Sequence, residues 1–203
     1  AAPPVSEASH VVRETVSATS VNEKLFTEDP ATKLQVVLEI ARQLSRTLDL
    51  DPLLEKLLEQ LMKLFPNADR VMAILCEGDQ LVVRAQRGKP GRDMATVPFS
   101  RTIVKRALDE GVGLISEDVQ SDKHYQTSHS ITSLDLHSVI CVPMINIEGK
   151  RLGVLQVDRF CKGFGFRLED LHLLTAIGME VTVVLENVSL HAEKMREQGL
   201  HQE

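Results

Sequence analysis

The spacing of apolar residues along the chain changes near residue 70, and the change separates a helical part from a part built of strands. Apolar residues three and four apart follow Asp29-Pro30, and a broader apolar face follows Asp51-Pro52 and ends at Pro66-Asn67. Proline is tolerated in the first helical turn, so each Asp-Pro pair predicts a helix start. The heptad-like seam of the first helix is Leu34, Val37, Ala41, Leu44 and Leu48.

From Arg70 onward, β-rich runs alternate with turn residues. Glu77-Gly78-Asp79 separates two such runs and predicts a hairpin, and a second hairpin turns around Gly149. Ser100 is the predicted N-cap of a helix over 101–109. The strands are too apolar to leave a face bare, so helices covering an antiparallel sheet are expected. The predicted strands are 70–76, 80–86, 94–98, 113–116, 137–145 and 151–158.

The two ends of the chain have different patterns. Residues 1–29 are rich in Ser, Thr, Glu, Ala and Pro and predict a linker or disordered tail. Residues 30–190 form the predicted domain, and 191–203 extend a long helix that starts at Leu168. That helix carries apolar or neutral residues alternately three and four apart: Leu174, Ile177, Val181, Val184, Val188, His191 and Met195. This seam predicts that the terminal helices meet, within one chain or in a homodimer, and a solvated tail after Asn187 is the alternative.

Composition narrows the class of protein. The chain has 203 residues, 43% of them apolar and 3% aromatic, and a net charge of −6 without a basic block. These values exclude a wholly disordered protein and argue against a nucleic-acid partner. Three cysteines fit a reducing compartment, and no apolar run reaches membrane-spanning length. We therefore expect a cytoplasmic module without membrane contact, cut from a longer protein.

Three stretches resemble GAF domains. Ser138–Met144, followed by Gly149 and Leu152–Asp158, resembles the paired late strands of that family, and Leu48–Leu54 with Asp69-Arg70 resembles its beginning. The exit helix is similar in Phe166–Leu174 and Leu185–Asn187. The resemblance covers about 34–190. It implies an α+β fold: a six-stranded antiparallel sheet, the N- and C-terminal helices packed on one face and a loop-covered pocket on the other.

The resemblance also implies a sensory or regulatory role rather than catalysis. GAF domains bind cyclic nucleotides, tetrapyrroles, haem, other small molecules or no known ligand, and they work beside other signalling domains. The expected partners are an unidentified small molecule, a second copy of the chain and other signalling domains of a longer protein. No cofactor is identified by the sequence. A purely structural dimerisation module without a ligand is the alternative from a different class.

The polar loop at 117–135 is where the resemblance places the lid of a pocket. In the functional interpretation, the side chains of this loop converge on a small polar ligand above the sheet. In the structural alternative, Asp118 and Asp122 cap turns and the histidines are solvated. The candidate ligand-binding residues are Asp118, Ser121, Asp122, His124, Tyr125, His129, Ser138 and Cys141.

Known GAF chemistries fit the remaining residues poorly. The positions that match the cyclic-nucleotide signature read Asp158-Arg159, Phe166 and Asp170-Leu171, and these departures favour a structural role, with Asp158 and Arg159 pairing with Asp170. The loop has no cysteine for a bilin, and His124, His129, His137 and Cys141 lack metal-ligand spacing.

An enzyme like free methionine sulfoxide reductase needs reactive cysteines in loops. Cys76 and Cys141 lie in predicted strands, where a cysteine is usually a small buried apolar residue. Only Cys161 is expected to be accessible. We therefore expect no catalysis.

Overall fold

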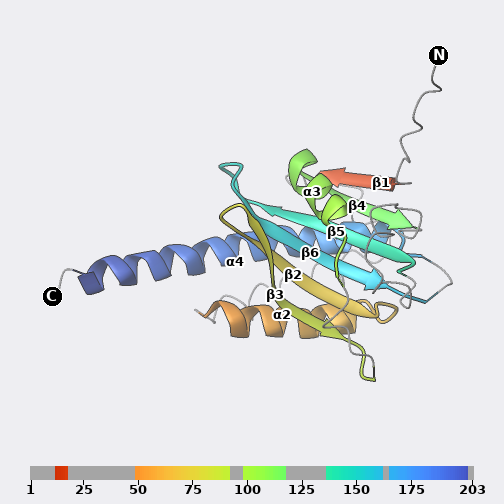
Figure 1. Cartoon of the computed structure of the whole chain (residues 1–203), viewed down its shortest axis with the longest axis horizontal. Helices are drawn as coiled ribbons and strands as arrows, with labels where there is room; N and C mark the ends of the chain where they lie inside the picture. Colours follow the sequence, from red (N-terminus) through yellow and green to blue (C-terminus); the bar gives the residue numbers. More distant parts are fainter. Residues whose placement is uncertain (1–11, 18–48, 92–97, 118–135, 162–164, 201–203) are drawn as a thin grey trace, which may run out of the picture.

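An antiparallel sheet organises the part of the chain that the computed structural model describes, residues 12–17, 49–91, 98–117, 136–161 and 165–200 (Figure 1). The strand order is β1-β4-β5-β6-β2-β3. The strands are β1 (Val12–Ser17), β2 (Arg70–Glu77), β3 (Gln80–Gly88), β4 (Val112–Glu117), β5 (Ser138–Ile145) and β6 (Arg151–Arg159). The helices are α2 (Leu50–Leu64), α3 (Arg101–Glu110) and α4 (Leu168–Leu200). The predicted α+β class and antiparallel sheet are confirmed.

The edge strand β1 differs from the sequence-based expectation. It lies within residues 1–29, where a linker or disordered tail is predicted, and pairs with β4 through partners such as Thr15 and Leu114. The segment has no sustained apolar period, but the open edge of β4 supplies backbone partners that local sequence cannot show. The strand predicted at 94–98 lies, except for Pro98, outside the described residues, and so does the helix predicted from Pro30.

Local signals set the helix ends. The backbone N–H of Ile103 donates to Ser100 Oγ at 3.3 Å, as expected of the predicted N-cap of α3. Gly111 ends α3 at a φ of 66°, the left-handed conformation that glycine adopts without a Cβ clash. Helix α2 begins after Asp49 and carries Pro52 in its first turn.

The two faces of the sheet are covered by different helices. On one face, α2 and α4 bury their leucine and valine stripes against the alternating residues of β2 and β5, among them Val71, Ala73, Ile140 and Val142. On the other face, α3 packs on Met72, Ile74, Val139, Cys141 and Val154. Period-two alternation sends neighbouring residues of each strand into these separate clusters.

Helix α4 runs past the sheet at its C-terminal end (Figure 1). Over Leu168–His191 it is apolar and long enough to cross a membrane by composition alone, but half of the most apolar window is buried inside the protein, as in a core helix. Five residues of the predicted seam are buried in the α2 and α4 cluster, and His191 is exposed. The buried five are Leu174, Ile177, Val181, Val184 and Val188. They pack on the chain's own sheet and so are not available to a partner.

Candidate functional site: a buried polar cluster on the face covered by α3

Three polar side chains lie fully buried on the sheet face that α3 covers. Arg70 and Asp158 are directly opposite each other on β2 and β6, and Gln156 lies two residues before Asp158 on the same face. The side chains of all three have an exposed fraction of 0%. Buried charged residues are rare unless they are paired, so this polar cluster needs a physical account.

Hydrogen bonds compensate the two charges. Arg70 Nε donates to Asp158 Oδ2 at 2.7 Å, and Gln156 Nε2 donates to Asp158 Oδ1 at 2.7 Å. The Arg70 guanidinium also lies over the Phe160 ring, 5.2 Å from its centroid. Burial raises the pKa of the Asp158 carboxyl, and Arg70 and the hydrogen bond from Gln156 oppose that shift. The result is a dry ion pair without net charge.

Asp69 ties three strand ends together beside the polar cluster. Its Oδ2 accepts a hydrogen bond of 2.8 Å from the backbone N–H of Phe160, just after β6. Its Oδ1 lies 3.4 Å from the ammonium of Lys89, just after β3. Arg70 adds a 3.4 Å hydrogen bond to the carbonyl of Pro98, ahead of α3. The polar cluster is therefore held by β2, by the segments after β3 and β6, and by the segment that leads into α3.

Two of the predicted ligand-binding residues are described, and they lie on opposite faces of β5. Ser138 Oγ accepts a 3.4 Å hydrogen bond from the backbone N–H of Phe166, which belongs to the α2 and α4 cluster. Cys141 belongs to the cluster under α3 and pairs in register with Gln156. They therefore do not form one pocket floor, because residues three apart on a strand point to opposite faces. The other six lie outside the described residues: Asp118, Ser121, Asp122, His124, Tyr125 and His129.

The residues at the cyclic-nucleotide signature positions have structural partners. Asp170 Oδ2 accepts a 2.8 Å hydrogen bond from the backbone N–H of Arg167 and so caps the start of α4. Asp158 pairs with Arg70, which sequence reasoning missed as a partner because the two residues lie 88 positions apart. The hint available in the sequence was an arginine at the start of an otherwise apolar strand.

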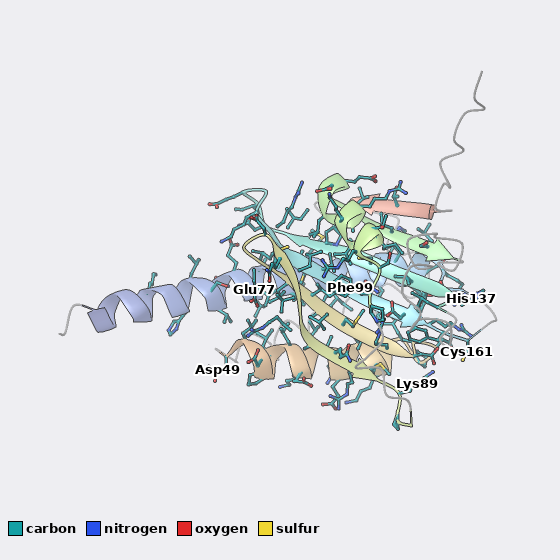
Figure 2. All side chains as sticks on the ribbon, viewed as in Figure 1. Asp49, Glu77, Lys89, Phe99, His137 and Cys161 are labelled. Atoms are coloured by element: carbon teal, nitrogen blue, oxygen red, sulfur yellow. The ribbon has the colours of Figure 1, made fainter. Side chains whose placement is uncertain are left out.

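The cysteines are separated along the sheet. Cys76 and Glu77 lie toward one end, and Lys89, His137 and Cys161 lie toward the other, as the labelled Glu77, Lys89, His137 and Cys161 show (Figure 2). Strand register puts Cys76 and Cys141 more than roughly 13 Å apart, beyond disulfide reach, and Cys161 lies past the end of β6. Burial raises the pKa of the Cys141 thiol far above its usual range, and the Asp158 charge adds to the shift. Among the described residues, no three side chains are placed to hold a metal ion.

Comparison with known proteins supports the sequence resemblance. A family model described as GAF domain matches residues 47–186. Comparison with curated proteins gives no match. Among solved structures, the GAF domain of a phosphoenolpyruvate-protein phosphotransferase from Coxiella burnetii has a TM-score of 0.66 at 14% identity, covering 82% of this chain and 99% of that one.

Two further solved structures share the fold. The free methionine-R-sulfoxide reductase from Neisseria meningitidis, in complex with its substrate, has a TM-score of 0.61 at 22% identity and covers 85% of this chain and 96% of its own. The GAF domain of a putative sensor histidine kinase from Pseudomonas syringae pv. tomato has a TM-score of 0.59 at 13% identity, covering 85% of this chain and 99% of that one. These identities show the fold and leave activity to the site itself.

Proposed function

Because the chain belongs to the GAF domain family, we propose that it is a non-catalytic sensory module that binds a small molecule on the face covered by α3. The observation that carries this proposal is the fully buried polar cluster of Arg70, Gln156 and Asp158. A buried ion pair adds little net stability compared with apolar residues of similar size, so a polar cluster at this position favours a role in recognition. A sensor histidine kinase is named among the structures of similar fold.

The connection from the polar cluster through the end of β6 to α4 supports the transmission of ligand binding to this helix. Asp158 lies next to the last residue of β6, and Phe166 follows it eight positions later along the chain. Phe166 is buried against the α2 and α4 cluster and is bonded to Ser138 at the start of β5. A displacement of the β6 end on ligand binding thus acts on the first turn of α4, and packed helices respond by shifting as units.

Homodimerisation through the exposed side of α4 is the second part of the proposal. Val183 and Leu190 lie seven residues apart on α4, with exposed fractions of 56% and 51%. The tip of the hairpin between β5 and β6 stands beside them: Asn146 Nδ2 donates to Glu186 Oε1 at 2.6 Å, and the adjacent Ile147 is fully exposed. This apolar surface replaces the buried seam as the dimer contact.

The cysteine geometry supports the absence of a reductase activity. Such chemistry needs an accessible thiolate and a resolving thiol, whereas Cys141 is buried and Cys76 and Cys141 lie beyond disulfide reach of each other. We keep the cytoplasm as the proposed location on the strength of these free thiols. An assay of free methionine sulfoxide reduction with a thiol reductant should show no turnover, and turnover abolished by Cys161→Ser would contradict this part of the proposal.

A structural dimerisation module without a ligand is the second candidate. The observation in its favour is the apolar filling under α3, where Ile103, Val104 and Ala107 cover Met72 and Ile74. The two candidates differ in what the purified full chain contains. Denaturing release followed by mass spectrometry should detect a small molecule in stoichiometric amount if the chain is a ligand-binding sensor. If no such molecule is detected and no metabolite extract changes the thermal stability, the structural dimerisation module is the candidate that stands.

The dimer is tested separately by light scattering on the purified chain. Val183→Lys with Leu190→Lys should convert a dimer to a monomer, because each lysine replaces an exposed apolar side chain by a charge of the same sign on both copies. Val83→Lys is the matched control, since Val83 is exposed on β3 with a fraction of 38%, outside this surface. A monomeric wild-type chain at high concentration would refute the dimer.

A further inference from the structure

Gln156 Oε1 is a buried acceptor without a hydrogen-bond partner, the only such side-chain atom in the described part of the chain. Its carboxamide is oriented by the hydrogen bond from Nε2 to Asp158 Oδ1. The nitrogen side of the amide is therefore already in use, and the oxygen side is open. A buried carbonyl oxygen without a donor is unfavourable, and native proteins rarely keep one without a reason.

The surroundings of this oxygen disfavour a negative charge. Asp158 carries a carboxylate within hydrogen-bond distance of the same amide. Arg70, the nearby cation, is compensated by that carboxylate. The register neighbours of Gln156 are Met72 and Cys141, and the cluster of α3 above them is apolar. An anion placed here would lose its hydration and would lie near the carboxylate of Asp158. The cation of the polar cluster, Arg70, is already paired with that carboxylate and would not compensate the anion.

We propose that Gln156 Oε1 accepts a hydrogen bond from an uncharged N–H donor of the bound molecule, such as a carboxamide or a nucleobase edge. The inference rests on the proposed function and deepens it, since it names the chemical class of the ligand. The end of the ligand that reaches the polar cluster is neutral, and any phosphate or carboxylate of the molecule lies away from it. Gln156 fixes the position and chemistry of that end, while Arg70 and Asp158 hold Gln156 in place.

The test uses probes of nearly equal shape and different charge. Nicotinamide and nicotinate form one pair, and orotamide and orotate form another; each pair compares a carboxamide with the carboxylate on the same ring. Binding to the full chain is measured by calorimetry and by the shift in melting temperature. We expect at least one uncharged member to bind and its charged counterpart to bind at least tenfold more weakly.

A variant of Gln156 identifies the contact. Gln156→Met keeps the length of the side chain and removes the acceptor, so it should weaken the uncharged probe about tenfold. Gln60→Met on α2, far from α3, is the matched control and should leave binding unchanged. If Gln156→Met does not fold, a crystal structure of the wild type with the probe replaces it, and should show the probe N–H within hydrogen-bond distance of Oε1.

Three results would overturn the inference. They are equal binding of charged and uncharged members, no binding of any probe, and a water molecule on Oε1 in the probe-soaked crystal. Failure of the proposed function looks different, because the full chain would then release no small molecule at all. A released ligand that is anionic at the polar cluster, or whose affinity ignores Gln156→Met, leaves the sensory role standing and removes this inference.

Discussion

Asp158→Asn should be the most costly of the conservative changes in the polar cluster. The substitution keeps the shape of the side chain and removes the charge that compensates Arg70, whose side chain is fully buried and cannot reach water. At an effective dielectric constant of about 20, Coulomb's law gives about 6 kcal/mol for unit charges as close as Arg70 Nε and Asp158 Oδ2. Asparagine has one oxygen acceptor and so retains one of the two hydrogen bonds that Asp158 accepts, which recovers part of this energy; we expect a loss of about 3–5 kcal/mol in the free energy of unfolding.

Arg70→Met should cost less than Asp158→Asn, and its cost should depend on pH. Arginine cannot lose its proton, whereas the carboxyl of Asp158 can be neutralised by gaining one. Burial already raises the pKa of Asp158, and removing the guanidinium raises that pKa further. A raised folded-state pKa means that the native state binds the proton more tightly than the unfolded state. The stability of Arg70→Met therefore increases as the pH falls through the raised folded-state pKa towards the ordinary carboxyl pKa of the unfolded chain, and this gain is lost as the pH rises back through the raised pKa.

Urea unfolding followed by far-ultraviolet circular dichroism measures these losses, since the chain has no tryptophan. The control pair is Arg84 and Asp51, joined at 3.0 Å on the surface with exposed side-chain fractions of 33% and 69%. Breaking it with Asp51→Asn should cost about 0–1 kcal/mol. A loss below about 1 kcal/mol for Asp158→Asn, or a loss for Arg70→Met that does not shrink as the pH is lowered, would refute the account of a dry, compensated pair.

Two further predictions concern packing and thiol reactivity. Gly153→Ala should cost about 3 kcal/mol or more in urea unfolding, because its Cβ would meet the Ile74 carbonyl oxygen at 2.2 Å, whereas Gly149→Ala, with nothing within 4 Å, should cost about 1 kcal/mol. Alkylation at pH 8, followed by peptide mass spectrometry, should modify exposed Cys161 first and Cys76 more slowly, since burial raises the pKa of Cys76. Cys141 should react only on unfolding, and early modification of Cys141 would show that α3 does not seal this face.

The ends of most elements follow from local signals. Ser100 and Gly111 set the ends of α3 because a hydroxyl caps free N–H groups and glycine adopts the left-handed conformation. The hairpins follow from period-two runs around short turns, and the structure places their strands within about two residues of the predicted ends. β1 was not predicted because the strand with which it pairs, β4, lies about 100 positions away along the chain.

The candidate site was predicted less well than the fold. The alternation that sends Ser138 and Cys141 to opposite faces is a local property, and the sequence shows it directly. Which of the two faces α3 covers is decided by packing, and with it the surroundings of Cys141. No sequence pattern indicates that Gln156 Oε1 lacks a hydrogen-bond donor, because this depends on which side chains surround the oxygen in the folded chain.

The sequence by itself determined the order of the elements from α2 to α4 and the antiparallel hairpins, because periodicity, caps and turns act over a few residues, and its motifs resemble those of the family to which the chain belongs. Only the tertiary structure decided that Arg70 meets Asp158, that the α4 seam is buried on its own sheet and that Gln156 keeps an open acceptor. These features join residues far apart along the chain. Their energies depend on burial and compensation, which are properties of the folded chain as a whole.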